Sequence, residues 1–414
     1  MRLQGQTLSR REWLAGAGGT LFLAGSPNPV GAPVAEGAPF DLLVKGGKVI
    51  DPSQDLEGPR DVAIAKGKIA RVEAGLPSTQ ARQVVDASGK IVTPGMIDLH
   101  THVFPYVGPY GIEPDPYFVT RGVTTVIDAG TSGAFTFAAF RRYTISKAAT
   151  RIRALLHVVS IGMVAGNLGE LIDLRYCDPK LAAQVAGENR DLIVGFKIRF
   201  SEKYTGPNDL EGMKRARAAA DEARLPLMIH IGGSYTPLGD LLKLMKKGDV
   251  VTHSYNDHPH GLLDHAGKIT PEVREARQRG VLFDLGHGAG SFSFDIAEKC
   301  LGDGFPPDTI SSDLYTANIN GPVYDLTTTL SKFLLLGMNL RDIITRCTVN
   351  SARTFKFGAD IGTLKPGAEA DVSVLELREG EFRFTDSVAK SRTGRQKLFP
   401  VVTVRGGKLF YPTA

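Results

Sequence analysis

Residues 94–102 read PGMIDLHTH, an apolar run that ends on two histidines separated by one residue. The pattern predicts a buried strand, in which residues two positions apart point to the same side. His100 and His102 would therefore converge at the end of the strand, and converging imidazoles are typical ligands of zinc. A His-x-His pair alone is weak evidence, so the rest of the chain must supply its partners.

Further apolar, β-branched runs follow this one, with helical segments such as 209–224 and 325–338 between most of them. The expected strands cover residues 95–100, 124–129, 154–161, 193–200, 225–231, 250–255, 281–285 and 309–313. Near-continuous apolar strands are typical of parallel sheets, and eight of them alternating with helices over about 260 residues predict an α/β fold, a (β/α)8 TIM barrel. A doubly wound sheet is the alternative, but no Gly-rich phosphate loop follows the first strand.

Strand-like segments with glycine turns also stand at both ends of this region. They cover residues 41–50, 61–72, 370–377 and 401–409. They predict a small β-sandwich domain assembled from both chain ends. The expected division is a signal and linker at 1–39, the β-domain at 40–92 and 358–414, and the barrel at 93–357.

The first 39 residues have the features of an export signal. SRREWL at 9–14 is a twin-arginine motif, and the apolar stretch at 15–25 is shorter than the ~20 residues of a membrane span. We therefore expect export by the twin-arginine machinery of a bacterium, a periplasmic or secreted product and no stable membrane anchor. A net charge of +5 without a long Lys/Arg run argues against a nucleic-acid partner. A homo-oligomer is left open.

Candidate partners of the two histidines lie at the ends of later expected strands: His230, His253 and Asp313. The active sites of TIM barrels lie at the carboxyl ends of the strands, so these side chains should meet the His-x-His pair at one rim. A single His or Asp at a strand end is more often a capping or core residue. Five such residues at one rim are hard to explain in that way.

Lys197 lies in the middle of the apolar strand expected at 193–200. A buried ammonium group is costly, and a lysine that loses its proton can react with carbon dioxide. The resulting carbamate is an anionic ligand that can bridge two metal ions. The alternative is a lysine that forms a salt bridge with a carboxylate of the barrel.

These residues together resemble, strand by strand, the binuclear, carboxylated-lysine pattern of the amidohydrolase superfamily. GTLKPGAEAD at 362–371 is similar to the motif with which such chains re-enter the β-domain. VGFKIR at 194–199 and FDLGHG at 283–288 resemble the deacetylase-like branch, which is related to the dihydroorotases. The resemblance extends from residue 41 to the C-terminus.

The resemblance implies two divalent metal ions, expected to be zinc, with carboxylated Lys197 between them. The first ion would be held by His100, His102 and Asp313, and the second by His230 and His253. Water bound between two cations has its pKa lowered towards ~7, so that hydroxide exists at neutral pH, and Asp313 would transfer its proton to the leaving group. The expected reaction is hydrolysis of an acyl amide or ester bond in a small carboxylate-bearing molecule.

Two residues are candidates for substrate contact. Arg199 lies two positions beyond Lys197 and could bind a carboxylate with two hydrogen bonds; a salt bridge within the protein is the alternative. His287 follows the seventh expected strand and could contact the substrate, or it could be a polar residue of the loop. The loop histidines at 258, 260 and 265 are less favoured as a metal site, and His157 is expected in the core.

Three other functions remain as alternatives. A cyclic amidase of the dihydroorotase or hydantoinase type is disfavoured by the export signal, because pyrimidine synthesis is cytoplasmic. A non-catalytic barrel that binds partners is disfavoured by the complete set of ligands. A phosphotriester or lactone hydrolase could use the same metal ions, since a fold does not determine the substrate.

Overall fold

The protein is described from a computed structural model, which covers residues 37–164, 166–358 and 360–413. The chain divides into two compact units, residues 1–33 and 34–414, and the described residues lie in the second. The predicted twin-arginine motif and apolar stretch lie outside the described residues. Among the helices of the described part, none is long and apolar enough to cross a bilayer.

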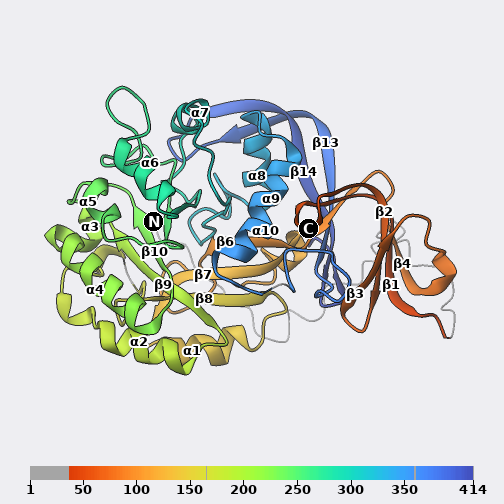
Figure 1. Ribbon diagram of the computed structural model, residues 1–414, viewed down its shortest axis with the longest axis horizontal. Coiled ribbons are helices and arrows are strands. Elements are labelled where there is room, and N and C mark those ends of the chain that lie inside the picture. Colours follow the sequence, from red (N-terminus) through yellow and green to blue (C-terminus); the bar gives the residue numbers. More distant parts are fainter. Residues whose placement is uncertain (1–36, 165, 359, 414) are drawn as a thin grey trace, which may run out of the picture. The chain divides into compact units, whose positions relative to one another are not determined.

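Each of the first seven apolar runs overlaps a strand of the barrel, and these strands are numbered from β6 onward (Figure 1). Within the described residues, seven parallel strands follow one another in chain order in one sheet. They are β6 (Met96–Thr101), β7 (Val123–Gly133), β8 (Arg151–His157), β9 (Ile193–Phe200), β10 (Leu227–Ile231), β11 (Val250–Thr252) and β12 (Leu282–Phe283). Every residue of β6 and β7 is buried, as expected for strands covered on both faces.

The eighth expected strand, residues 309–313, closes the barrel without forming a regular strand. Its backbone makes one parallel bridge at each edge of the sheet, between Thr309 and Asp284 and between Leu314 and Thr101. The barrel predicted from eight apolar runs is therefore confirmed, but its last member lies outside the regular ladder.

Side chains explain why this last segment is irregular. Ser312 donates both its N–H and its hydroxyl to the carboxylate of Asp98, so polar side chains replace part of the ladder. Asp313 has a φ of 49°, in the left-handed region that a regular strand excludes. Its N–H still donates to the carbonyl of His100 at 2.7 Å, which keeps the segment against β6.

Helices alternate with the strands, and Figure 1 shows α1, α2 and α4 along the outside of β7–β9. The helices are α1 (Phe137–Phe140), α2 (Pro179–Glu188), α3 (Glu202–Thr205), α4 (Asp209–Ala223), α5 (Leu238–Leu242), α6 (Pro271–Gln278), α7 (Phe294–Gly302), α8 (Leu326–Leu335), α9 (Leu340–Cys347) and α10 (Val349–Thr354). The expected helices at 209–224 and 325–338 correspond to α4 and α8. Acidic Asp209 and Glu211 in the first turn of α4 favour its start, because they complement the helix dipole.

The strands of both chain ends form one further sheet in the described residues. Its members are β1 (Phe40–Asp51), β2 (Leu56–Ala65), β3 (Lys68–Glu73), β4 (Ala81–Asp86), β5 (Ile91–Pro94), β13 (Val372–Thr385), β14 (Ser391–Arg405) and β15 (Lys408–Phe410). The strand β5 pairs with both β1 and β13 and so joins the two ends edge to edge. Separate apolar clusters, one with Leu42 and one with Leu43, lie on it. The small β-domain expected from both chain ends is thus present, and its strands are joined in one hydrogen-bonded sheet.

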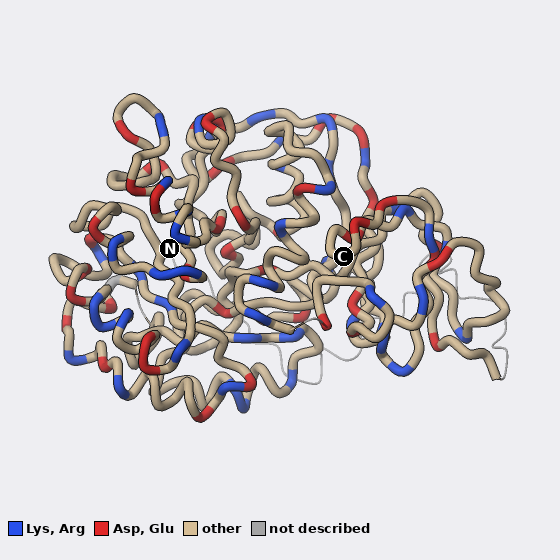
Figure 2. The backbone as a smooth tube through the Cα atoms, in the orientation of Figure 1, with Lys and Arg blue, Asp and Glu red and all other residues tan. Residues whose placement is uncertain are grey.

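The charged residues are mixed along the described chain. Figure 2 shows Lys and Arg interspersed with Asp and Glu on the helices, loops and strands. Many exposed charges also form ion pairs, such as Arg141 with Asp191 at 2.9 Å. Such pairs contribute little to stability. Positive and negative side chains are thus intermingled along the described chain (Figure 2).

Candidate active site

The ends of the barrel strands bring the predicted metal ligands together. One cavity of about 680 Å³ is lined by all six of them: His100, His102, Lys197, His230, His253 and Asp313. The strands β6, β9 and β10 carry three of the six, two follow the ends of β6 and β11, and the closing segment carries the last. The convergence expected from the strand ends is therefore present.

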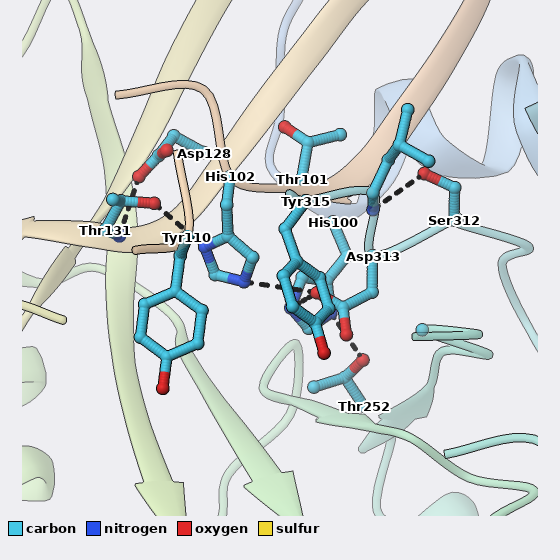
Figure 3. Close-up of polar contacts among 12 residues, drawn as sticks. His100, Thr101, His102, Tyr110, Asp128, Thr131, Thr252, Ser312, Asp313 and Tyr315 are labelled. Atoms are coloured by element: carbon cyan, nitrogen blue, oxygen red, sulfur yellow. Dashed lines mark hydrogen bonds and ion pairs between the residues drawn. The ribbon is translucent and has the colours of Figure 1, made fainter. Parts of the chain in front are cut away.

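The contacts within this group fit a bound cation. Oδ1 of Asp313 lies 3.3 Å from Nε2 of His100 and 3.1 Å from Nε2 of His102, and Figure 3 shows the three side chains pointing toward one another. This oxygen is buried and makes no hydrogen bond. Ligand atoms of His100, His253 and Asp313 lie within 4.8 Å of one another. A buried carboxylate oxygen without a hydrogen bond, facing imidazole nitrogens, is a suitable metal ligand.

Hydrogen bonds fix which nitrogen of two rings is free to bind metal. Thr252 donates its hydroxyl to Asp284 at 2.8 Å, so its oxygen must accept the proton on Nδ1 of His100 at 2.9 Å. The Nδ1 of His253 lies 2.6 Å from the carbonyl of Gly286, which can only accept. Both rings therefore carry their proton on Nδ1 and keep Nε2 for a metal ion.

The ring of His102 is held in a similar way. Its Nδ1 lies 2.8 Å from the hydroxyl of Thr131, and the N–H of Thr131 donates to Asp128 at 2.8 Å (Figure 3). Asp128 also accepts from the N–H of Val103 at 2.8 Å, so one carboxylate fixes both the strand end and the residue behind the ring. Sequence reasoning missed these supporting residues, although Asp128 lies within the apolar run at 124–129 that predicted β7 and Thr131 lies two residues beyond it.

Burial favours the neutral form of three of these histidines: His100, His230 and His253. It lowers the pKa of His100 and of His230 well below the ordinary value, and positive neighbours, including Lys197, act in the same direction. Burial also lowers the pKa of His253 to about 4, although the negative charge of Asp313 opposes it. Neutral imidazole is the form that binds metal, so these side chains are ready to act as ligands at neutral pH.

Lys197 is fully buried and poorly hydrogen-bonded. Its Nζ lies 3.2 Å from Nε2 of His100 and 3.7 Å from the sulfur of Met228. Burial lowers the pKa of Lys197 to about 7, against the negative charge of Asp313. A substantial fraction of the side chain is then an uncharged amine, which can act as a nucleophile toward carbon dioxide.

Arg199 lines the same cavity, but its charge is already paired. Its Nε donates to Glu170 at 2.9 Å, and Nη2 bonds the second oxygen of that carboxylate. The guanidinium also lies 3.9 Å from the ring centre of Tyr204. Nε2 of His157 lies 3.2 Å from Oε2 of Glu170, the oxygen that Nε of Arg199 also contacts, and His157 is a core residue as expected. Of the two readings of Arg199, the salt bridge within the protein is present in the structure.

His287 lies after the seventh strand, as expected, but inside the protein and away from the cavity. The ring is fully buried and is absent from the residues that line the cavity. Its Nε2 faces Nζ of Lys332 at 2.6 Å, and its Nδ1 faces the carbonyl of Gly288 at 2.9 Å. Of the two readings of His287, the contacts favour a polar residue held within the protein, because both ring nitrogens already have partners there.

The loop histidines at 258, 260 and 265 border a second cavity and do not form a metal cluster. Among the described residues, only His100, His253 and Asp313 form such a group. His258 also lines the first cavity, and its Nε2 lies 3.0 Å from the carbonyl of Gly290. The low expectation for this loop as a metal site agrees with these contacts.

Known proteins match most of this chain. The model of the amidohydrolase family matches residues 91–409. A deacetylase of Enterococcus faecalis is 36% identical over 375 residues, which cover 90% of this chain and 99% of that protein. A solved structure described as an adenine deaminase has 36% identity and a TM-score of 0.84, covering 90% of this chain and 100% of that one. A solved dihydroorotase has 30% identity and a TM-score of 0.82, covering 90% and 98%.

Proposed function

Because this chain belongs to the amidohydrolase family, we propose that it hydrolyses an acyl amide or ester bond in a small carboxylate-bearing substrate. The observation that carries the proposal is the convergence of six ligand-type side chains on one cavity, with the tautomers of His100 and His253 fixed. The complete set favours an enzyme over a barrel that only binds partners.

The site suits two divalent cations, expected to be zinc. His100, His102 and Asp313 would hold one, and His230 and His253 the other. Lys197, carboxylated on its amine, would bridge the two. Such cations, when bound, lower the pKa of a water molecule and polarise the carbonyl of the substrate. The rings of His230 and His253 support this pairing, because their centres lie 4.2 Å apart.

Asp313 would move the proton in this reaction. Its carboxylate faces the space between His100 and His102 and would accept the proton of the attacking water. It would then deliver that proton to the nitrogen or oxygen of the leaving group. His253 and Asp313 both have left-handed φ angles, 69° and 49°. Such strain is concentrated at functional sites, where the surrounding structure holds it.

The deacetylase name of the Enterococcus protein supports a linear acyl substrate. The cavity wall includes two cations, Arg199 and Lys203, which would attract a substrate carboxylate. Since Nε and Nη2 of Arg199 contact Glu170, a carboxylate would meet Nη1 or approach the pair as a whole. Tyr110, Tyr204 and Tyr315 also line the cavity and offer hydroxyl groups and apolar faces.

A cyclic amidase is the second candidate, and the similarity to a solved dihydroorotase favours it. A panel of linear N-acetyl amino acids and O-acetyl hydroxy acids, compared with dihydroorotate and hydantoins, separates the two candidates. Faster hydrolysis of the linear substrates supports the deacetylase-like proposal. Faster opening of the cyclic substrates would replace it.

The first test is the metal content per chain, measured together with hydrolysis before and after chelation. The proposal predicts about two metal ions per chain, loss of activity on chelation, and recovery when zinc and bicarbonate are added. No bound metal, and no activity after zinc and bicarbonate are supplied, would favour a non-catalytic barrel.

We also propose that the chain acts after twin-arginine export, in the periplasm or outside the cell. The support is the SRREWL motif at 9–14. Fractionation of cells that express the wild type or the Arg10→Lys/Arg11→Lys variant provides the test. Retention of the variant in the cytoplasm is expected, and equal export of both proteins would contradict this localisation.

A further inference from the structure

Lys332 is a buried cation that the proposed reaction does not use. It lies in α8, and its side chain is fully buried. Its Nζ lies 2.6 Å from Nε2 of His287, and it donates to the carbonyls of Pro322 at 2.9 Å and Thr385 at 2.7 Å. Three acceptors from three separate segments match the three N–H groups of an ammonium ion.

The tautomer of His287 gives this contact its direction. Its Nδ1 lies 2.9 Å from the carbonyl of Gly288, which can only accept, so Nδ1 carries the proton. Nε2 is then the unprotonated nitrogen and accepts from Lys332. The ring centre also lies 4.5 Å from that of Phe292, so the imidazole is fixed on its face as well as at both nitrogens.

The turn between β13 and β14 holds the same loop from the C-terminal side. The hydroxyl of Ser387 donates to the carbonyl of Gly288 at 3.0 Å, and its N–H donates to the carbonyl of Phe292 at 2.9 Å. The N–H of Phe294 donates to the Asp386 carboxylate at 3.0 Å. Residues 286–294 are thus joined to the C-terminal hairpin, which contains the Thr385 carbonyl that Lys332 also binds.

The beginning of this loop lies directly against two proposed metal ligands. The carbonyl of Gly286 accepts from Nδ1 of His253 at 2.6 Å. A Cβ placed on Gly288 would lie 2.5 Å from Oδ2 of Asp313, so the backbone packs against that carboxylate. The N–H of Gly288 also donates to the carbonyl of Ser312, the residue before Asp313, at 3.0 Å. A shift of the loop would therefore move His253 and Asp313.

We propose that Lys332 is a positioning residue that fixes His253 and Asp313 through His287 and the backbone of residues 286–288. Lys332 is not one of the residues that line the cavity. The C-terminal hairpin thereby becomes a support of the active site, although it contributes no ligand. The effect on rate rests on the proposed function, whereas the effect on His253 does not.

The first experiment compares Lys332→Met with the wild type. Methionine keeps an unbranched stem and removes the three donors. We expect kcat to fall by about 10- to 100-fold with KM changed less than about threefold, because a displacement of reacting groups by about 1 Å costs on the order of 100-fold in rate. Lys390→Met is the matched control: this exposed lysine lies on the turn of the same hairpin and contacts Asp295 of α7, and kcat should stay unchanged. A Lys332→Met enzyme with kcat within about twofold of the wild type would overturn the proposal.

Two substitutions at His287 separate its two contacts. In His287→Gln the amide oxygen can replace Nε2 as the acceptor for Lys332, whereas in His287→Asn the amide nitrogen can replace only Nδ1. The Gln variant should retain more of kcat than the Asn variant. Adding Lys332→Met to His287→Asn should lower kcat little further, because the hydrogen bond between Lys332 and residue 287 is already absent in His287→Asn. If Lys332→Met does not fold, the His287 pair decides, and an equal loss in both variants would count against the proposal.

Imidazole NMR of the protein as purified, labelled with ¹⁵N-histidine, gives a measurement that needs no substrate. His287 should show the tautomer with the proton on Nδ1, and Lys332→Met should shift the ring signals of His253. A shift of His253 in a protein that hydrolyses none of the substrates would reject the proposed function and retain the positioning role. Unchanged His253 signals would reject the positioning role.

Discussion

Two fully buried lysines, Lys197 in β9 and Lys332 in α8, lie in opposite kinds of environment. Burial lowers the pKa of each to about 7. Lys332 has three nitrogen or oxygen acceptors within 2.9 Å. Lys197 has one imidazole nitrogen at 3.2 Å and the sulfur of Met228 at 3.7 Å.

The difference shows that burial alone does not assign a role to a lysine. Where three acceptors surround the nitrogen, as at Lys332, its hydrogens are all engaged and the side chain joins segments of the fold. Where acceptors are few, as at Lys197, the amine remains available for chemistry. Strongly perturbed ionisable groups in a cavity are candidates for function, and the contacts of each group decide between chemistry and support.

The largest expected effect separates the chemistry of the two lysines. Lys197→Met should lower kcat/KM by at least about 10⁴-fold, because it removes the proposed bridging ligand and with it the bound cations. Elemental analysis should find fewer than about one metal ion per chain in this variant. Lys332→Met should keep about two. Full metal content and activity in Lys197→Met would contradict the role proposed for Lys197.

Stability should rank the two lysines in the reverse order. After chelation, Lys332→Met should lower the free energy of unfolding by roughly 3 kcal/mol, because it leaves three buried acceptors without a donor, each of which costs about 1–3 kcal/mol before relaxation. Lys197→Met should change it by less than about 1 kcal/mol, since few contacts are lost. Urea unfolding of both metal-free variants measures this, and similar losses would remove the distinction.

Arg199 is a third buried basic side chain, and its partner is a carboxylate, that of Glu170. Burial raises the pKa of Glu170, but the positive charge of Arg199 and the neighbouring His157 outweigh it and hold the pKa at about 2, below the ordinary 4.5. The ionised carboxylate thus stabilises the fold above about pH 4.5, and this contribution is lost as the pH falls toward 2.

Glu170→Gln should therefore destabilise the protein at pH 7, and the gap from the wild type should narrow by about 1–2 kcal/mol between pH 7 and pH 3.5. Urea unfolding at several pH values measures the gap. Glu188→Gln is the control, because this residue in α2 lies at an exposed position. A gap that stays constant over this range would show that the Glu170 carboxylate gains nothing from Arg199.

The smallest effect concerns substrate binding by the same arginine. Arg199→Met should raise KM for substrates with a carboxylate by about tenfold, and for neutral analogues by less than about threefold, because a charge-assisted bond to the substrate is lost. KM values for one acidic and one neutral ester of equal size test this. Equal increases would leave Arg199 only as a support of Glu170. Arg199 and Lys332 would then both stabilise the fold, and Lys197 alone of the three would take part in the chemistry.

Much of the site follows from sequence pattern. Alternation at residues 94–102 places His100 and His102 on one side of a strand, and parallel strands in a barrel end at one rim. The positions of His230, His253 and Asp313 at later strand ends then bring them to the same cavity. Local periodicity and the order of strands suffice for this, so the fold class and the six ligand-type residues could be predicted.

What only the tertiary structure decided is how the remaining polar groups are paired. Arg199 pairs with Glu170 from a distant loop, and His287 turns to Lys332 instead of the cavity. The closing segment leaves the ladder because Ser312 bonds Asp98. These pairings depend on which loops and helices meet in space and on which donors remain for each buried acceptor, and strand periodicity does not encode either.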